Sequence, residues 1–504
     1  MWSFIGLVLG FVHVAFAIVY LYLTWHHNYW KKRGIVTAKP FTILGTYPGV
    51  LGWGKRGLVL DVQEVYNKYK GKHRAVGTFL TREPQLLILD PALAHEILVT
   101  NFNNFRDTIT SGFVGHNEDD KYVARNPFFS SGDTWKKRRT EGGGGLTANR
   151  LKLGYAIWQE SGQRLLKYME KAIAEKGNII ETRDLSYRFM ANTMADFIWG
   201  IDAGSLTCKV QEQCEFQKVS TAWAFIAFQS ITKFNRSLVA PFMRKLLQMR
   251  LFSKETDAFY LQLTQQAVKL RQNGNGSNRA DYLSHLIQLQ QKGNIMDDSV
   301  GHALTVLMDG YETSGAVLYH LLYSLSEYHE VQEKLRTEIL DALGDDKSIS
   351  YEELIALPYL DQCVNESLRL TTPIGFLMKI CTRPTQIDVG NDKTLNLEPG
   401  VSVLIPAFQF HHDESLYPQA DEFKPERFGN EPATEFTKRG MLLPFGDGPR
   451  ICLGMRVGQL NVKTAVVQIL SQYKIRQTKK LSMSSDSGLG LFLDGDIELE
   501  YIKL

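Results

Sequence analysis

The stretch PFGDGPRICLG, Pro444–Gly454, places a single cysteine in a glycine-rich segment. Beyond this cysteine, Cys452, apolar residues recur with helical spacing at Leu453, Val457, Leu460, Val467 and Leu470. Cys452 is therefore predicted to lie at or just before the N-terminus of a helix. Free backbone N–H groups and the positive end of the helix dipole would favour its thiolate form.

The residues around Cys452 indicate what the cysteine can bind or react with. Gly446, Gly448 and Gly454 allow the backbone to turn tightly and to approach a large, flat group. Arg450 puts a positive charge two residues before the sulfur, where it suits an anion such as a carboxylate. A low-pKa thiolate without a second cysteine nearby indicates either a nucleophile or a single axial metal ligand.

The stretch resembles the haem-binding loop of cytochrome P450 monooxygenases, F-x-x-G-x-R-x-C-x-G, and matches every fixed position. This resemblance implies that the cofactor is haem b, iron protoporphyrin IX, and that Cys452 is its axial thiolate ligand. Thiolate donation to the iron favours cleavage of the O–O bond. The resemblance also implies that Arg450 pairs with a haem propionate and that Phe445 packs near the sulfur.

Other segments resemble the cofactor-binding residues of the same family. Trp135 and Arg139 lie four residues apart and match W-x-x-x-R, which implies donation to the haem propionates. Lys379 stands where relatives often carry an arginine with the same task. A lysine offers a point charge without the bidentate fork of arginine.

A charged motif precedes the cysteine stretch. Glu366 and Arg369 are spaced to lie on one helix face, and Arg427 follows about sixty residues later in the run PERF. In the family this order implies a buried charge triad behind the haem. Such a triad fixes structure, and the loss of one member would leave an uncompensated buried charge.

The run DGYETS, residues 309–314, resembles the oxygen-binding motif [AG]-G-x-[DE]-T-[TS]. The resemblance implies that Glu312 and Thr313 are the catalytic pair that delivers protons to iron-bound oxygen. The Thr313 hydroxyl is also expected to bond the carbonyl four residues back. Asp309 replaces the usual small residue, so the distal pocket would gain a carboxylate if this side chain faces the haem.

A second departure from the family is the glycine run Gly142–Gly145, just after the segment with Trp135 and Arg139. Each glycine within a helix costs about 1 kcal/mol relative to alanine. Either the helix ends at Glu141, or this stretch differs from the native sequence.

The composition excludes several classes of protein. Lys plus Arg number 57 against 54 Asp plus Glu among 504 residues, so no basic field indicates a nucleic acid partner. Five cysteines without a C-x-x-C pair argue against a disulfide framework and against a structural zinc site. The hydrophobic share of 44% can bury a large core.

The N-terminus is predicted to be a membrane anchor. Residues 1–26 form an apolar run that is long enough, as a helix, to cross a bilayer. Residues 27–50 carry Lys31, Lys32 and Arg33 and then a turn-rich hinge, and positive residues stay on the cytosolic side. The expectation is a single-pass protein of the endoplasmic reticulum membrane, with the domain of residues 51–504 in the cytosol. The alternatives are a buried core helix or a long signal peptide.

The remaining pattern predicts a mainly α fold with small β-sheets, the cytochrome P450 fold, after one N-terminal transmembrane helix. Helical periodicity covers Leu151–Ala174 and Asp298–Leu325. Strands are expected at Leu86–Leu89 and Val401–Pro406. The sequence as a whole resembles insect microsomal members of the family.

The resemblance implies a monooxygenase that inserts one oxygen atom of O₂ into a lipophilic substrate, such as a xenobiotic, a steroid or a fatty acid. The chain has no G-x-G-x-x-G after a strand, so electrons from NADPH must come through a partner. The family implies NADPH–cytochrome P450 reductase, with cytochrome b5 as an additional donor. The alternatives are an isomerase or dehydratase of the same fold and a haem-binding sensor without turnover.

The expected pocket lining is apolar and aromatic, as ligand sites usually are. Its members are Phe113, Phe225, Phe228, Leu304, Ile374, Phe376, Leu491 and Phe492, together with Asp309.

Overall fold

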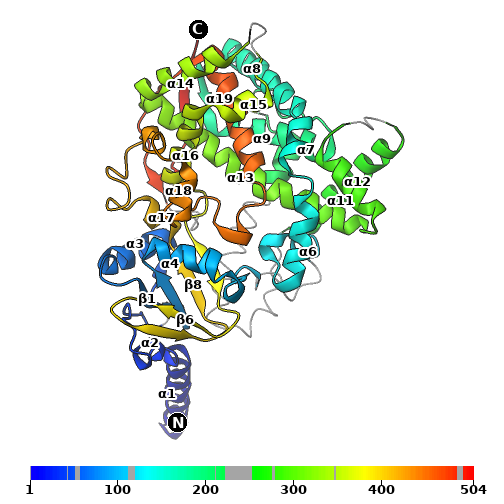
Figure 1. Ribbon diagram of the computed structural model, residues 1–504. Helices are drawn as coiled ribbons and strands as arrows, with labels where there is room; N and C mark the ends of the chain where they lie inside the picture. Colours follow the sequence, from blue (N-terminus) through cyan, green and yellow to red (C-terminus); the bar gives the residue numbers. More distant parts are fainter. Residues whose placement is uncertain are drawn as a thin grey trace.

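The computed structural model describes residues 2–42, 44–51, 57–111, 120–210, 212–221, 252–274, 279–344, 348–484 and 492–504. A large helical part sits above a smaller part built around a sheet, and the two chain ends lie at opposite ends of the molecule (Figure 1). The predicted fold class, mainly helical with small sheets, is confirmed.

The helices of the body begin near the sheet and continue through the upper part. Their bounds are α3 Leu58–Tyr69, α4 Pro91–His95, α6 Gly132–Gly143, α7 Ala148–Leu153, α8 Ala156–Lys176, α9 Thr182–Trp199, α11 Lys254–Gln272, α12 Tyr282–Gln291, α13 Met296–Glu327, α14 His329–Ala342, α15 Tyr351–Ala356, α16 Pro358–Leu370, α17 Ala407–His411, α18 Ala433–Lys438 and α19 Met455–Gln472. Short 3-10 turns include η5 Val123–Arg125, η6 Pro127–Phe129 and η9 Gly448–Arg450.

The two predicted helices differ in outcome. The prediction at Asp298–Leu325 corresponds to the single helix α13. The prediction at Leu151–Ala174 was wrong as one helix, because α7 and α8 are separate elements that meet at Gly154. A Cβ atom on Gly154 would lie 2.3 Å from the carbonyl oxygen of Ala280, so a neighbouring segment crosses the chain at this point.

Helix α13 crosses the middle of the helical part and packs against α9 and α19 (Figure 1). Glycines allow this close approach. A Cβ on Gly310 would lie 2.8 Å from the Met194 side chain of α9, and one on Gly315 would lie 2.6 Å from the Tyr187 ring.

The largest sheet has the strand order β1-β2-β8-β5-β3. Its strands are β1 Ala75–Leu80, β2 Glu83–Ile88, β8 Ser402–Ile405, β5 Leu377–Ile380 and β3 Asp107–Thr108. Strand β2 pairs parallel with β8, and the other neighbours are antiparallel. The predictions at Leu86–Leu89 and Val401–Pro406 correspond to β2 and β8.

Smaller sheets complete the fold. They are β4 Ile179–Glu181 with β12 Glu498–Lys503 and β9 Tyr473–Gln477, β6 Thr385–Asp388 with β7 Thr394–Leu397, and β10 Met483–Ser484 with β11 Phe492–Leu493. One apolar cluster fills the helical part and a second lies under the main sheet. Phe445 and Leu453 pack against the first cluster, whereas Leu443, directly before the cysteine loop, belongs to the second, so the loop lies where the two clusters meet.

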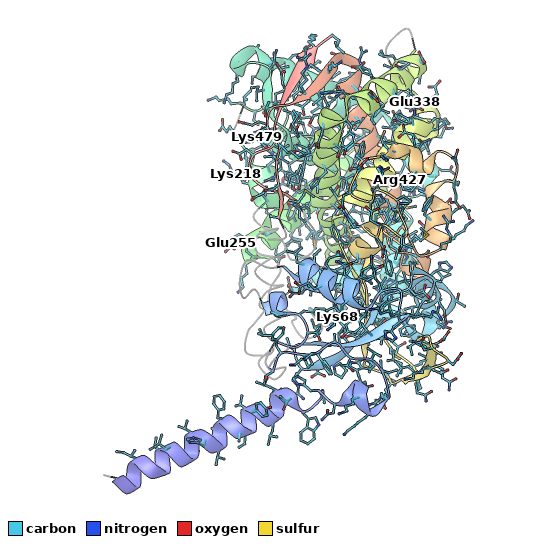
Figure 2. The ribbon with its side chains drawn as sticks, turned by 90° about the vertical axis from the view of Figure 1, so that its left-hand side faces the viewer. Lys68, Lys218, Glu255, Glu338, Arg427 and Lys479 are labelled. Carbon is cyan, nitrogen blue, oxygen red and sulfur yellow. The ribbon has the colours of Figure 1, made fainter. Side chains whose placement is uncertain are left out.

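The N-terminal helix α1, Trp2–Thr24, projects away from the body (Figure 2). Most of its described apolar side chains are exposed; Phe11 and Phe16 are each 76% exposed, whereas Leu23 at its end is buried. Among the residues that the structure describes, none of the helices combines the length and apolarity needed to cross a bilayer. The membrane anchor therefore stays a prediction.

The segment after α1 is attached firmly to the main sheet. In α2, Tyr29–Lys32, Trp30 is fully buried, and its indole N–H donates to the Thr78 carbonyl at 2.8 Å. A Cβ on Gly77 would lie 2.3 Å from the Trp30 ring, so this glycine makes the room. The Trp30 ring therefore packs inside the protein and anchors this segment to the sheet.

Candidate active site

The cysteine loop closes on itself through backbone hydrogen bonds. Helix α19 begins at Met455, just after Cys452, as predicted. The Cys452 N–H donates to the Phe445 carbonyl at 2.8 Å, and the Ile451 N–H donates to the Gly448 carbonyl at 3.0 Å. The loop thus holds the sulfur at a fixed place before the helix.

Two of its three glycines have a backbone conformation that favours glycine. Gly446 has φ +72° and Gly448 has φ +67°. A Cβ on Gly448 would lie 2.1 Å from the Leu98 carbonyl oxygen, so the loop touches a neighbouring backbone there. Gly454 has an ordinary φ of −91°, and a Cβ on it would meet no protein atom within 4 Å. The loop therefore leaves room beside Cys452.

Side chains fasten the loop to the rest of the chain. His95 and Asp447 bond at 2.8 Å between Nδ1 and Oδ2. Arg450 donates from Nε to the Arg106 carbonyl at 2.6 Å and from Nη2 to the Ser130 carbonyl at 3.0 Å. Arg450 therefore joins the cysteine loop to the segments before and after η6.

The environment of Cys452 differs from the expected low-pKa thiolate. The backbone N–H groups of Gly454 and Met455 lower the thiol pKa, as predicted for a helix start. Burial has the larger effect, and together with the negative charge of Asp309 it raises the pKa of Cys452 to about 11. In the protein alone the thiol is therefore a poor nucleophile. A metal ion would deprotonate it directly, so of the two roles that the sequence left open the environment favours the metal ligand.

Cations without carboxylate partners gather beside this loop. Lys379 is 3% exposed and donates to the Arg106 carbonyl at 3.4 Å. Burial, with Arg450 nearby, lowers the pKa of Lys379 to about 7. Arg139 donates to the Ile451 carbonyl at 2.7 Å. Among the described residues no carboxylate is within ion-pair range of Lys379 or Arg139. Lys379 is buried and Arg139 is half-buried, and cations withdrawn from water in this way favour an anionic partner.

Arg450 and Trp135 complete this cluster. The Arg450 guanidinium lies 4.4 Å from the centre of the Trp135 ring, and Trp135 is buried. Arg450 also lies 3.5 Å from Asp107, the carboxylate in its ion pair. Burial lowers the pKa of Arg450 to about 10. A thiol with open space beside it, and a group of cations of which two have no carboxylate partner, fit a flat, metal-containing group with carboxylate substituents, and haem has this chemistry.

The three residues of the predicted charge triad lie together. Glu366 and Arg369 belong to α16, and Arg427 belongs to the 3-10 turn Pro425–Phe428. Glu366 and Arg369 are fully buried and form a bidentate pair, with both N···O distances at 2.8 Å. Arg427 Nε donates to the same carboxylate at 3.0 Å. Arg369 also donates to the His411 carbonyl at 2.5 Å. Figure 2 labels Arg427 on the helical body, well away from α1.

The middle of α13 carries the acid and the alcohol predicted from the DGYETS run. The Thr313 hydroxyl donates to the Asp309 carbonyl, as expected. The Glu312 carboxylate accepts a hydrogen bond of 2.8 Å from the Tyr187 hydroxyl of α9. Burial raises the pKa of Glu312 to about 7, while the bond from Tyr187 opposes this rise. A group that titrates near neutral pH is suited to proton transfer.

The comparison with known families decides the identity of the fold. The sequence model of the cytochrome P450 family matches residues 38–494. The chain belongs to the cytochrome P450 family. Its relatives include the probable cytochrome P450 309a1 of Drosophila melanogaster. The two sequences are 67% identical over 504 residues, and the match covers the full length of both.

More distant relatives are also insect cytochromes P450. The probable cytochrome P450 309a2 of Drosophila melanogaster is 49% identical over 99% of this chain and 93% of its own length. Cytochrome P450 6j1 of Blattella germanica is 31% identical over 92% of this chain and 90% of its own length. The expected resemblance to insect members is confirmed. As a cytochrome P450, the protein is a haem-thiolate monooxygenase that binds haem through a cysteine thiolate.

The glycine run of this cytochrome P450 has a packing role. Helix α6 ends at Gly143, two residues beyond Glu141, where one of the two alternatives placed its end. A Cβ on Gly144 would lie 2.8 Å from the His285 ring, and one on Gly145 would lie 2.5 Å from the Tyr282 ring. The run lets α12 lie directly against the end of the helix that carries Trp135 and Arg139.

The predicted pocket residues of the cytochrome P450 are only partly placed. Leu304 and Phe376 are buried, whereas Ile374 and Phe492 are half-buried. Leu304 belongs to the helical cluster and Phe376 to the sheet cluster, on the two sides of the cysteine loop. The other predicted members lie outside the described residues: Phe113, Phe225, Phe228 and Leu491.

The sequence did not reveal two side chains that contact the middle of α13. Tyr187 has no motif around it, and its role depends on the packing of α9 against α13. Asn126 interacts with Asp309 and caps the turn η6. The Asn-Pro pair at 126–127 is a turn signal that could have drawn attention to this position.

Proposed function

We propose that this cytochrome P450 inserts one oxygen atom of O₂ into a lipophilic small molecule, with electrons from NADPH delivered by a reductase. The observation that carries the proposal is the cysteine loop, in which Cys452 sits near Arg450, Lys379 and Arg139; the last two donate to backbone carbonyls, and only Arg450 has a carboxylate partner, Asp107. This arrangement suits haem iron at the sulfur and haem propionates at the cations.

In this proposal the chain's residues hold the cofactor from several elements. Cys452 would ligate the haem iron through its thiolate, and Phe445 would pack next to the sulfur. Arg139, Lys379, Arg450 and Trp135 would hold the propionates. The bound haem activates dioxygen, and the thiolate favours O–O cleavage. Glu366, Arg369 and Arg427 keep the backbone behind the site in place without touching the reacting atoms.

Glu312 and Thr313 are proposed to supply protons. The titration of Glu312 near neutral pH allows it both to take a proton from solvent and to release it. Tyr187 holds the carboxyl toward α9 in the structure, so it sets the position from which Glu312 acts. The Thr313 hydroxyl lies one residue further along the same helix.

The substrate is proposed to be lipophilic, such as a xenobiotic, a steroid or a fatty acid. The described members of the predicted lining are apolar at Leu304, Ile374, Phe376 and Phe492, and Asp309 is the charged exception. Burial of apolar area on such a lining is the main source of binding free energy for a lipophilic molecule.

The protein is proposed to be anchored in the endoplasmic reticulum membrane by α1, with its body in the cytosol. Exposed apolar side chains surround α1 in the described part, and water would hydrate such a surface unfavourably. NADPH–cytochrome P450 reductase, and additionally cytochrome b5, are the proposed electron donors. Lys136 and Lys137 are exposed on α6, the helix that carries Arg139, and offer a basic surface near the cysteine loop.

The test is turnover of the full-length protein with reductase, NADPH and isotopically labelled dioxygen. A panel of lipophilic compounds is first screened for shifts of the haem spectrum. The expected result is NADPH-dependent product that carries one labelled oxygen atom. Product without NADPH would instead indicate an isomerase or dehydratase, and ligand binding without any product would indicate a sensor.

A further inference from the structure

Asp309 faces the interior of the protein and not its outer surface. The preceding residues of α13, from Gly301 to Met308, are all buried, whereas the Asp309 side chain is accessible. Yet burial by the surrounding protein raises its pKa to about 7. An accessible carboxyl that is enclosed by protein must border an internal space. Helix α13 packs against α19, which begins directly after the cysteine loop, and the charge of Asp309 raises the pKa of Cys452, so this space lies on the side of α13 that faces the cysteine loop.

Asn126 is the second polar group at this place. It is 1% exposed, and its Oδ1 accepts a hydrogen bond of 2.8 Å from the Phe128 N–H, which fixes the orientation of the amide. Its Nδ2 has no close hydrogen-bond partner. The amide is near enough to Asp309 to favour the ionised carboxylate, which lowers the pKa of Asp309. A buried donor without a close partner needs a physical explanation.

The turn that carries Asn126 is held rigidly against α13. Arg125 donates to Asp298 at 2.9 Å, and Arg138 of α6 donates to the same oxygen at 2.8 Å. A Cβ on Gly301 would lie 2.5 Å from the Arg125 side chain, so Arg125 packs directly against α13 at this glycine. The distance between Asn126 and Asp309 is therefore set by the fold.

The charge of Asp309 is not balanced within the described part of the chain. None of the described lysine, arginine or histidine side chains forms an ion pair with it, and the side chain that interacts with it, Asn126, is uncharged. A carboxylate enclosed by protein is costly to ionise unless a cation offsets its charge. The site is thus complementary to a positive group.

We propose that Asp309, oriented by Asn126, determines specificity by binding the cationic nitrogen of a lipophilic substrate. The proposal rests on the proposed function, because it concerns the substrate of the same site. Like charge would repel a carboxylate-bearing ligand such as an ionised fatty acid. A neutral lipophile gains nothing from the unbalanced charge, so a lipophilic amine is the favoured class.

The test uses two ligands of the same shape that differ in charge. One carries a trimethylammonium group at the end of an apolar chain, and the other carries a tert-butyl group in its place. Neither can coordinate iron, because the quaternary nitrogen has no lone pair. Their affinities for the haem-loaded, full-length protein are measured from the shift of the haem spectrum on titration.

The native protein is expected to prefer the trimethylammonium ligand by about tenfold or more. Asp309→Asn, which keeps the shape, and Asp309→Ala, which restores the small residue usual in the family, should both abolish the preference. The matched control is Glu312→Gln, which removes the neighbouring carboxyl that faces Tyr187 and should keep the preference. Asn126→Ser retains a capping oxygen without the amide and should weaken the preference in part.

Equal affinities in the native protein, or a preference that survives in Asp309→Ala, would overturn the inference. The carbon monoxide spectrum of each variant shows whether haem is bound through thiolate. Incorporation of labelled oxygen into the neutral ligand tests the proposed function separately. A protein that oxidises the neutral ligand but shows no charge preference would retain the proposed function and lose this inference.

Discussion

The cysteine loop and the middle of α13 lie on two sides of the same site, and they differ in how their polar groups are bonded. In the loop, the backbone of Cys452 and the side chains of Asp447 and Arg450 all have partners within the chain. Around the middle of α13, among the described residues, the Asn126 Nδ2 has no close partner and no cation forms an ion pair with Asp309.

This difference in bonding reflects two different tasks, holding a cofactor and engaging a ligand or a proton. The loop reaches its final conformation through the chain's own bonds, which suits a part that must hold a cofactor rigidly. The middle of α13 carries polar groups that cost free energy until a ligand or proton engages them. Substitutions on the loop side should therefore act on folding and haem uptake, and those on α13 should act on selectivity and proton transfer.

The largest effect is expected from Arg369→Ala. The substitution leaves the Glu366 carboxylate buried without its bidentate partner, at a cost of about 3–5 kcal/mol in the free energy of unfolding. Haem content, measured against total protein, should fall steeply. Arg439→Ala is the control, because Arg439 pairs with Glu431 at the surface, where an ion pair contributes at most about 1 kcal/mol. A haem-loaded Arg369→Ala protein with native stability would contradict the role of the triad.

A smaller effect is expected from Gly448→Ala. The loop holds this residue at a positive φ, which alanine disfavours, and the new Cβ would press on the Leu98 carbonyl, so the loop must move. Gly400→Ala is the matched control, since Gly400 also has a positive φ, of +93°, but open space at its Cβ. The control should cost about 1–2 kcal/mol. Thermal unfolding should show a larger loss for Gly448→Ala, and equal losses would mean that the contact with Leu98 does not matter.

The smallest effect on stability is expected from Tyr187→Phe, about 0.5–1.5 kcal/mol for one hydrogen bond. Without the hydroxyl, the Glu312 carboxylate loses a donor and its pKa should rise above about 7. The pH dependence of product formed per NADPH consumed should shift to higher pH. Tyr319→Phe is the control, because this ring packs edge-on against Tyr187 at 6.3 Å and its pKa is raised chiefly by burial. An unshifted profile for Tyr187→Phe would remove Glu312 from the proton path.

Sequence reasoning succeeded where the chemistry is local. The loop before α19, the pairing of Glu366 with Arg369 and the bond from Thr313 to the preceding turn depend on residues close in the chain or on a recognisable motif. The family itself followed from the ten residues around Cys452.

It failed where distant segments meet. The fit of Gly144 and Gly145 depends on rings of α12, and the burial of Trp30 depends on Gly77 in the sheet. The thiol pKa of Cys452 was expected to be low because the helix start is visible in the sequence. Desolvation and the charge of Asp309 arise only in the folded chain, and they reverse the shift. Tyr187 and Asn126 were missed for the same reason.

The most direct test of the account is the spectrum of the reduced protein with carbon monoxide, because only a thiolate-ligated haem gives the strongly red-shifted band of this family. The native protein should show this band, and so should Cys381→Ala, which removes a fully buried cysteine of the sheet cluster. Cys452→Ala and Cys452→His should lose it. A full band in either Cys452 variant would contradict the account, since another residue would then bind the iron.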